Sequence, residues 1–156
     1  MDIFWEELTS GLPDARQLVH VLIRMIAASV LGAVVGMQRE KAGKPAGLRT
    51  HMLVSLGTAV IVLACSGVGM SSEAVSRVVQ GIVTGIGFLG AGAILKLDQE
   101  REIQGLTTAA GIWMTAAIGV AVGLGSLGVA LLSTLFTLVI LALAGLLDND
   151  QPTKNH

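Results

Sequence analysis

The sequence predicts an all-α integral membrane protein, a helical bundle with five transmembrane helices. Charged residues make up only 13% of the 156 residues, hydrophobic residues make up 53%, and 20 residues are glycine. Soluble domains carry roughly 25% charged residues and about 7% glycine, so this chain has too little polar surface to face water on all sides. Five long apolar stretches fill most of the chain, and these are the predicted spans.

Each stretch is long enough to cross a membrane, because about 20 helical residues cover a hydrocarbon core roughly 30 Å thick. The spans cover residues 18–37, 52–70, 78–95, 106–124 and 127–147. They define an extracytoplasmic N-terminal segment (1–17), a membrane domain (18–147) and a short cytoplasmic tail (148–156). The last two spans must be separate helices, because residues 106–147 in one helix would be about 63 Å long. Gly123, Gly125 and Ser126 suit the tight turn between them.

Positive charges in the short loops predict the orientation of the chain. With an extracytoplasmic N-terminus, seven Lys and Arg residues fall on the cytoplasmic side and two on the other side. The seven are Arg39, Lys41, Lys44, Arg49, Lys96, Arg101 and Lys154, and the two are Arg16 and Arg77. The acidic N-terminal segment lacks the basic start of a signal peptide, so we expect the first span to be retained.

Glycines on two faces of the third span predict close helix packing. They are Gly81, Gly85, Gly87, Gly90 and Gly92. Small residues let helix backbones touch in lipid, where no hydrophobic force drives helices together. Two further pairs have a four-residue spacing, Gly32 with Gly36 and Gly119 with Gly123. An alternative for the third span is an unwound segment whose backbone binds a ligand.

Arg24 is the one formally charged side chain well inside a predicted span. An arginine at membrane depth costs about 2.5 to 3.5 kcal/mol on insertion scales, so it is a candidate functional residue. Glu73 and Gln80 begin the third span in the same leaflet and are its expected partners. The alternative is that the long side chain reaches the membrane interface without a partner.

A polar cluster is expected where the second and fourth spans begin, because the positive ends of both helix dipoles point to the cytoplasmic face. Its residues are Arg39, Glu40, Arg49, Thr50, Thr107 and Thr108. Such a cluster would bind an anion, a lipid headgroup or an acidic protein segment. The alternative is structural: the basic residues only set the orientation, Glu40 pairs with Arg49, and the two later threonines cap a helix.

Several function classes are disfavoured by what the sequence lacks. None of the five spans contains Asp or Glu, whereas Mg²⁺ is bound through oxygen ligands that normally include carboxylates. No metal-ligand spacing is present, no nucleophile has a positioned base, and no cofactor motif fits, so we expect neither an enzyme nor a cofactor. The net charge of −1 gives no basic field for nucleic acid. The single Cys65 cannot form an intrachain disulfide.

Three sequence blocks resemble the MgtC/SapB family of bacterial membrane proteins. The first is GAVVGMQRE at 32–40 with KPAGLRTH at 44–51, the second is GIGFLGAGAI at 85–94, and the third is GLTTAAGIW at 105–113 with its continuation to Gly119. The resemblance implies a multi-pass protein of the bacterial cytoplasmic (inner) membrane that helps cells cope with low magnesium, acid or life inside host cells. Better-known members are considered regulators of other membrane proteins, including the ATP synthase and envelope phosphate or magnesium systems.

Many members of that family carry a soluble domain after the last span, whereas this sequence stops nine residues after Leu147. We therefore expect a short form, and a non-enzymatic protein that modulates partner membrane proteins through its glycine-rich helix faces and its cytoplasmic Arg/Thr cluster. The expected partners are the lipid bilayer, other membrane proteins and further copies of the chain. The alternative function is a small transporter or channel for magnesium or an anion.

Overall fold

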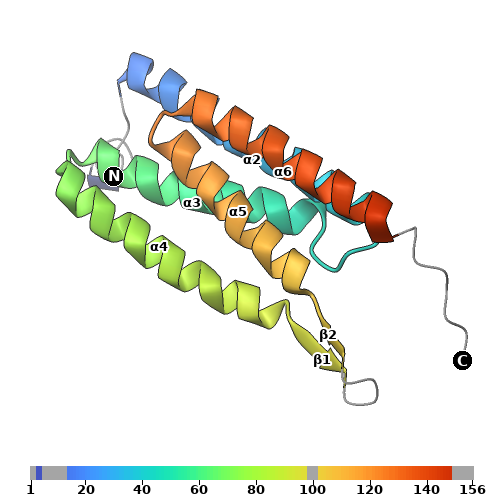
Figure 1. Ribbon diagram of the computed structural model, residues 1–156. Helices are drawn as coiled ribbons and strands as arrows, with labels where there is room; N and C mark the ends of the chain where they lie inside the picture. The colour runs from blue at the N-terminus through green and yellow to red at the C-terminus, as the bar shows by residue number, and fades with distance from the viewer. Residues whose placement is uncertain (1–2, 5–13, 98–101, 149–156) are drawn as a thin grey trace, which may run out of the picture.

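The computed structural model describes residues 3–4, 14–97 and 102–148, and its five long helices lie where the five spans are predicted (Figure 1). The helices are α2 (Ala15–Lys41), α3 (Leu48–Gly67), α4 (Ser72–Gly92), α5 (Leu106–Gly123) and α6 (Leu127–Asp148). The first four are long and apolar enough to cross a membrane. Helix α6 has 22 residues, about 33 Å, and Leu127–Leu143 is its apolar part. The all-α class is therefore confirmed, while the predicted N-terminal segment and tail lie mostly outside the described residues.

A short antiparallel ribbon, β1 (Leu95–Leu97) with β2 (Glu102–Gln104), connects α4 to α5. Leu95 pairs with Gln104 and Leu97 with Glu102. The sequence predicts no strand here, because the alternation of apolar and charged residues covers only three positions. The predicted third span, 78–95, also extends three residues beyond the observed end of the helix. Helix α4 stops at Gly92, where glycines weaken the helix.

Helix α3 lies between α2 and α5, and glycine pairs bring all three backbones close together. A Cβ atom placed on Gly32 would lie 2.6 Å from the carbonyl oxygen of His51, and one on Gly36 would lie 2.7 Å from Cα of Leu48. On the other side of α3, a Cβ on Gly123 would lie 2.7 Å from Cβ of Val62. Only glycine permits such contacts, so packing through the two four-residue pairs is confirmed.

The remaining helices flank this three-helix core. Helix α6 packs against α5 and α2, whereas α4 packs mainly against α5 and lies at the edge of the bundle (Figure 1). The main apolar core is fully buried between the central helices and receives two side chains from α6. Its members are Ala28, Leu31, Val35, Ala59, Ile118, Val122, Ala130 and Leu141.

The predicted turn between the last two spans is present, and it closes α5 with a pair of reverse hydrogen bonds. The Ser126 N–H donates to the carbonyl of Ala121 and the Gly125 N–H donates to that of Val122, both at 2.9 Å. This Schellman arrangement requires a left-handed residue after the cap, and Gly125 supplies it with φ of +85°. The chain then reverses directly into α6.

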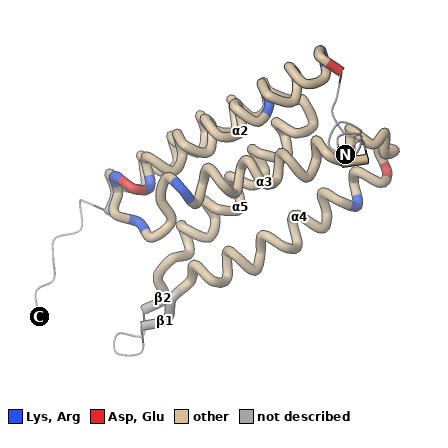
Figure 2. The backbone as a smooth tube through the Cα atoms, turned by 180° about the vertical axis from the view of Figure 1, so that it is seen from behind, with Lys and Arg blue, Asp and Glu red and all other residues tan. Residues whose placement is uncertain are grey.

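Two ends of the bundle are distinguished by their connections. We call the end with loop 42–47 and the β ribbon the ribbon end, and the end with loops 68–71 and 124–126 the far end. In the described part of the chain, charged residues gather at these two ends and leave the middle almost uncharged, as Figure 2 shows. A charge-free band between two charged ends is what a bilayer requires of a spanning bundle.

Candidate functional site

Arg39 and Thr108 meet at the ribbon end, although 69 positions separate them in the sequence. Arg39 lies in the last turn of α2 and is 3% exposed, and Thr108 lies in the first turn of α5 and is 2% exposed. The Nη2 of Arg39 donates to Oγ1 of Thr108 at 3.2 Å. The structure therefore brings together two of the predicted cluster residues from different sequence blocks.

A hollow of about 530 Å³ opens beside this pair, and we call it the α5 hollow. It is lined by Arg39, Gly43, Lys44, Pro45, Ala93, Gln104, Gly105, Leu106, Thr107 and Thr108. Three segments meet here: the end of α2 with its loop, the end of α4, and the start of α5. Among the described residues, two cations and two threonine hydroxyls share the lining, and none of the lining residues is a carboxylate.

Gly105 fixes the mouth of the α5 hollow. It is the N-cap of α5, has φ of +93° and provides no side chain to cap the helix. A Cβ at this position would overlap the carbonyl oxygen of Ala93, which follows α4. Glycine at this position therefore lets the start of α5 lie directly against the end of α4.

Glu40 has a structural role that differs from the pairing considered in the sequence analysis. Its Oε2 accepts the backbone N–H of Leu48 at 2.9 Å, and the N-cap residue of α3, Gly47, makes no capping bond of its own. The carboxylate from the end of α2 therefore caps α3. It forms no ion pair with Arg49, since the one ion pair among the described residues joins Arg77 to Glu73.

Arg49 and Thr50 are exposed and lie in an adjoining hollow rather than beside Thr107. This α3 hollow has a volume of about 440 Å³ and is lined by Glu40, Lys44, Pro45, Gly47, Leu48, Arg49 and Thr50. Lys44 and Pro45 also line the α5 hollow. All six predicted cluster residues thus lie at one end of the bundle and line neighbouring hollows, and a third hollow is lined by both Thr50 and Thr108.

Inside the bundle, a buried polar column of His51, Ser55, Thr58 and Thr115 was not predicted. His51 is fully buried, and its Nδ1 lies 2.7 Å from Oγ1 of Thr115, which donates to the carbonyl of Gly111 at 2.9 Å. Because the threonine has one hydrogen, Nδ1 of His51 is the donor in this pair. Thr58 reaches the carbonyl of Ala116 at 3.1 Å, again between α3 and α5.

Two atoms of this column have no hydrogen-bond partner among the described residues, Nε2 of His51 and Oγ of Ser55. Buried polar atoms of this kind are uncommon and need an explanation. A sequence signal was available: positions 51, 55 and 58 are polar and fall on one face of α3, with Ser55 and Thr58 inside the predicted span 52–70 and His51 directly before it. That spacing indicates a polar face directed at another helix.

Arg24 has a partner, but it is neither Glu73 nor Gln80. Its Nη1 donates to the carbonyl oxygen of Gly123 at 3.1 Å, at the C-terminal end of α5. Free carbonyls and the negative end of the helix dipole make this end attractive to a cation. Glu73 instead forms its ion pair with Arg77 at 2.9 Å. The intramembrane charge is therefore compensated by a neighbouring helix end.

The Arg24→Gln variant is expected to lower the free energy of unfolding by about 1 kcal/mol, because it removes a partly buried hydrogen bond from a charged donor. The matched control is Arg77→Gln, which removes an exposed ion pair and is expected to change stability by less than about 0.5 kcal/mol. Denaturation of both variants in detergent, followed by circular dichroism, measures the difference. Equal losses would contradict the assigned partner of Arg24.

Apart from Gly90, the glycines of α4 do not pack against another helix in the described part of the chain, so the close helix packing predicted for them is not found within the bundle. A Cβ on Gly81, Gly85, Gly87 or Gly92 would meet nothing within 4 Å, and only Gly90 approaches another helix, with Cβ of Ala109 at 3.7 Å. The reason is the edge position of α4, which leaves most of its surface free. Close packing of these glycines against a helix of another molecule stays a prediction.

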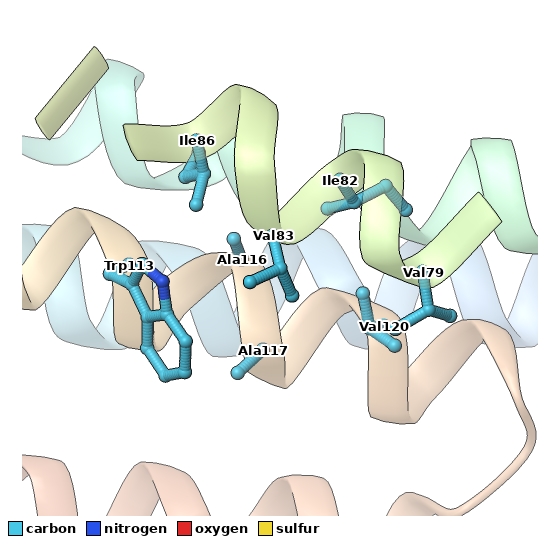
Figure 3. A pocket seen from close by; sticks show the side chains of 8 residues that line it. All are labelled: Val79, Ile82, Val83, Ile86, Trp113, Ala116, Ala117 and Val120. Carbon is cyan, nitrogen blue, oxygen red and sulfur yellow. The ribbon is translucent and has the colours of Figure 1, made fainter. Parts of the chain in front are cut away.

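Larger side chains carry the contact between α4 and α5. Val79, Ile82, Val83 and Ile86 of α4 face Trp113, Ala116, Ala117 and Val120 of α5 around an apolar hollow of about 120 Å³ (Figure 3). No charged group lines it, so it offers no acid–base chemistry. Among the described residues, no three His, Cys, Asp or Glu side chains lie close enough to hold one metal ion.

Together the fold and the polar ribbon end define a multi-pass helical membrane protein. The family model of the MgtC family matches residues 25–149, and the chain belongs to this family. The chain is 44% identical over 130 residues to "Protein SrpB" of Synechococcus elongatus. The matched region covers 76% of this chain and 71% of SrpB. No solved structure matches.

Two further relatives are longer than this chain. "Putative magnesium transporter YhiD" of Escherichia coli K12 is 39% identical over 145 residues, covering 86% of this chain and 65% of YhiD. "Protein MgtC" of Salmonella typhimurium LT2 is 42% identical over 117 residues, covering 75% of this chain and 49% of MgtC. The chain thus spans about two thirds of one relative and half of the other.

Proposed function

We propose that this chain is a non-enzymatic protein of the bacterial inner membrane that modulates partner membrane proteins during adaptation to low magnesium, acid or host stress. The observation that carries the proposal is the free face of α4. Gly81, Gly85 and Gly92 lie on this face with open space around them, and Phe88 between them is 83% exposed. Small residues around one large side chain suit close contact with a second helix in lipid.

The ribbon end supplies polar recognition beside this face. Arg49 and Lys44 are exposed cations on the α3 hollow. A third hollow, of about 350 Å³, lies between the α3 hollow and α4, because its lining includes Thr50 of α3 together with Phe88 and Gly92 of α4. A partner helix on the α4 face therefore has basic and hydroxyl groups at its end. A second copy of the chain is one such partner.

Photo-crosslinking in native membranes tests the proposal. A benzoylphenylalanine in place of Phe88 is expected to capture a partner, whereas the same probe in place of Phe136, 64% exposed on α6, is expected to capture none specifically. Gly85→Leu should abolish capture, because its side chain would fill the free face. Gly128→Leu, also in open space, is the control. Equal capture at both probes, or capture that survives Gly85→Leu, would defeat the proposal.

The second candidate is a small transporter or channel for magnesium or an anion. The observation in its favour is the buried polar column, with its two atoms that lack partners in the described chain. The name of the relative YhiD also refers to magnesium transport. Purified protein in liposomes separates the two candidates: saturable flux that Arg49→Ala or Thr115→Val abolishes would establish transport and displace the modulator proposal.

We further infer that the ribbon end is cytoplasmic, following the excess of Lys and Arg there. In a Cys65→Ala background, Arg16→Cys is expected to react with an impermeant maleimide in intact cells. Arg49→Cys is expected to react only after the membrane is disrupted. Both positions are exposed and lie at opposite ends of the bundle, so access depends on the side of the membrane. The reverse pattern would invert the orientation.

A further inference from the structure

We propose that the α5 hollow binds a phosphate group, either as free phosphate or as the headgroup of an anionic lipid. This inference rests on the proposed function and deepens the polar recognition that it assigns to the ribbon end. It rests on three features of the hollow: an uncompensated buried guanidinium, an uncapped helix start, and the lack of carboxylates among the lining residues that the structure describes.

The buried guanidinium is the strongest of these features. Arg39 is 97% buried and lines the hollow, yet the one hydrogen bond of its side chain among the described residues goes to the neutral hydroxyl of Thr108. Its Nε has no partner in the described part of the chain, and its charge has no acidic partner there. A buried charge of this kind is unfavourable until an anion neutralises it.

The start of α5 points its free donors toward the same hollow. The first backbone bond of the helix runs from the N–H of Ala109 to the carbonyl of Gly105, at 2.8 Å. The N–H groups of Leu106, Thr107 and Thr108 before it therefore have no helical acceptor. At the starts of three other helices a side chain accepts one of these free N–H groups: Asp14 caps α2, Glu40 caps α3 and Ser71 caps α4. At α5 that place is open for an anion.

The chemistry of the lining selects a phosphate group over other ligands. A guanidinium presents a planar fork that matches two phosphate oxygens, and Lys44 adds a second positive charge at the rim. Hydroxyls of Thr107 and Thr108 complete a set of donors. A divalent cation is disfavoured at this place, because the lining residues that the structure describes include two cations and no carboxylate.

Phosphate binding can be measured on the purified full chain without any partner protein. Inorganic phosphate is titrated onto the protein in neutral detergent and followed calorimetrically. In parallel, retention of phosphatidylglycerol from mixed micelles with phosphatidylcholine is followed by native mass spectrometry. Arg39→Lys keeps the charge but loses the fork, and it is expected to weaken binding about tenfold, the equivalent of one charge-assisted hydrogen bond.

Lys44 is exposed in the loop between α2 and α3, so we expect the Lys44→Gln variant to fold. This variant is expected to weaken binding about threefold. Arg16→Gln removes an equal charge from the opposite end of the bundle and should leave binding unchanged. If only the inorganic phosphate titration responds to the variants, the ligand is soluble phosphate. If only phosphatidylglycerol retention responds, it is the lipid headgroup. If neither responds to Lys44→Gln and Arg39→Lys while both variants keep their helical spectra, the inference is overturned.

The phosphate experiment and the crosslinking experiment can fail separately. If phosphate binding is intact but the crosslinking probe at position 88 captures no partner, the modulator proposal is defeated and the phosphate site remains. Capture at Phe88 without phosphate binding would leave the modulator proposal and remove the site.

Discussion

Gly119→Ala is expected to lower the free energy of unfolding by about 3 kcal/mol, the upper part of the range for inserting a methyl group into a packed interior. A Cβ at Gly119 would overlap both Oγ1 of Thr58 and the carbonyl oxygen of Ser55. The carbonyl belongs to the backbone of α3 and cannot rotate away, so α5 must move outward. The measurement is the unfolding of the purified chain in mixed detergent micelles.

The matched control for this variant is Gly85→Ala in α4. A Cβ at Gly85 meets nothing within 4 Å, and alanine favours a helix over glycine, so no loss of stability is expected. The two variants make the same chemical change in helices of the same kind. The change in helix propensity is the same in both variants, so equal destabilisation would contradict an energetic role for the contact between α3 and α5 at Gly119.

Gly105→Ala is the second variant with a large expected effect, a loss of about 2 kcal/mol together with a weakened phosphate site. Alanine in the left-handed conformation costs about 1 kcal/mol at this N-cap, and its Cβ would also overlap the carbonyl oxygen of Ala93. The ends of α4 and α5 must then separate, which opens the α5 hollow. Unfolding and the phosphate titration measure the two consequences.

Gly43→Ala isolates the conformational part of this effect. Gly43 also has a positive φ, +65°, but a Cβ there would meet nothing within 4 Å. Gly43→Ala is expected to lower the free energy of unfolding by about 1 kcal/mol, which is the cost of alanine in the left-handed backbone conformation alone. If Gly43→Ala and Gly105→Ala lose the same stability, the close contact between the ends of α4 and α5 has no energetic role.

Much of the fold follows from the sequence, because the length of an apolar run and the thickness of a bilayer determine each helix. The turn at Gly125 and the packing of two glycine pairs were also predictable from local spacing. The β ribbon was not, since three residues carry too little pattern. Which glycines touch another helix was not predictable either, because that depends on α4 being at the edge of the bundle.

For the candidate site, the sequence predicted the gathering of charged and hydroxyl groups at one end but not their pairing. Arg39 and Thr108 were grouped correctly, whereas the partners expected for Arg24, and the partner that the structural alternative gave to Glu40, were wrong. In both errors the true partner is a backbone group, the carbonyl of Gly123 or the N–H of Leu48. Every residue has such groups, so no residue type in the sequence indicates which helix end a charged side chain will meet.

The position of α3 between α2 and α5 has a consequence for the order in which the bundle can assemble. Synthesis delivers α2 and α3 first, and Glu40 joins them as soon as both have entered the bilayer. The side chains of His51 and Thr58, which contact Thr115 and Ala116 of α5 in the finished fold, lack these partners until α5 is made some forty residues later. Helix α4 is synthesised during that interval. The growing chain must therefore keep these polar side chains of α3 inside the bilayer without their α5 partners until its fourth long helix is inserted.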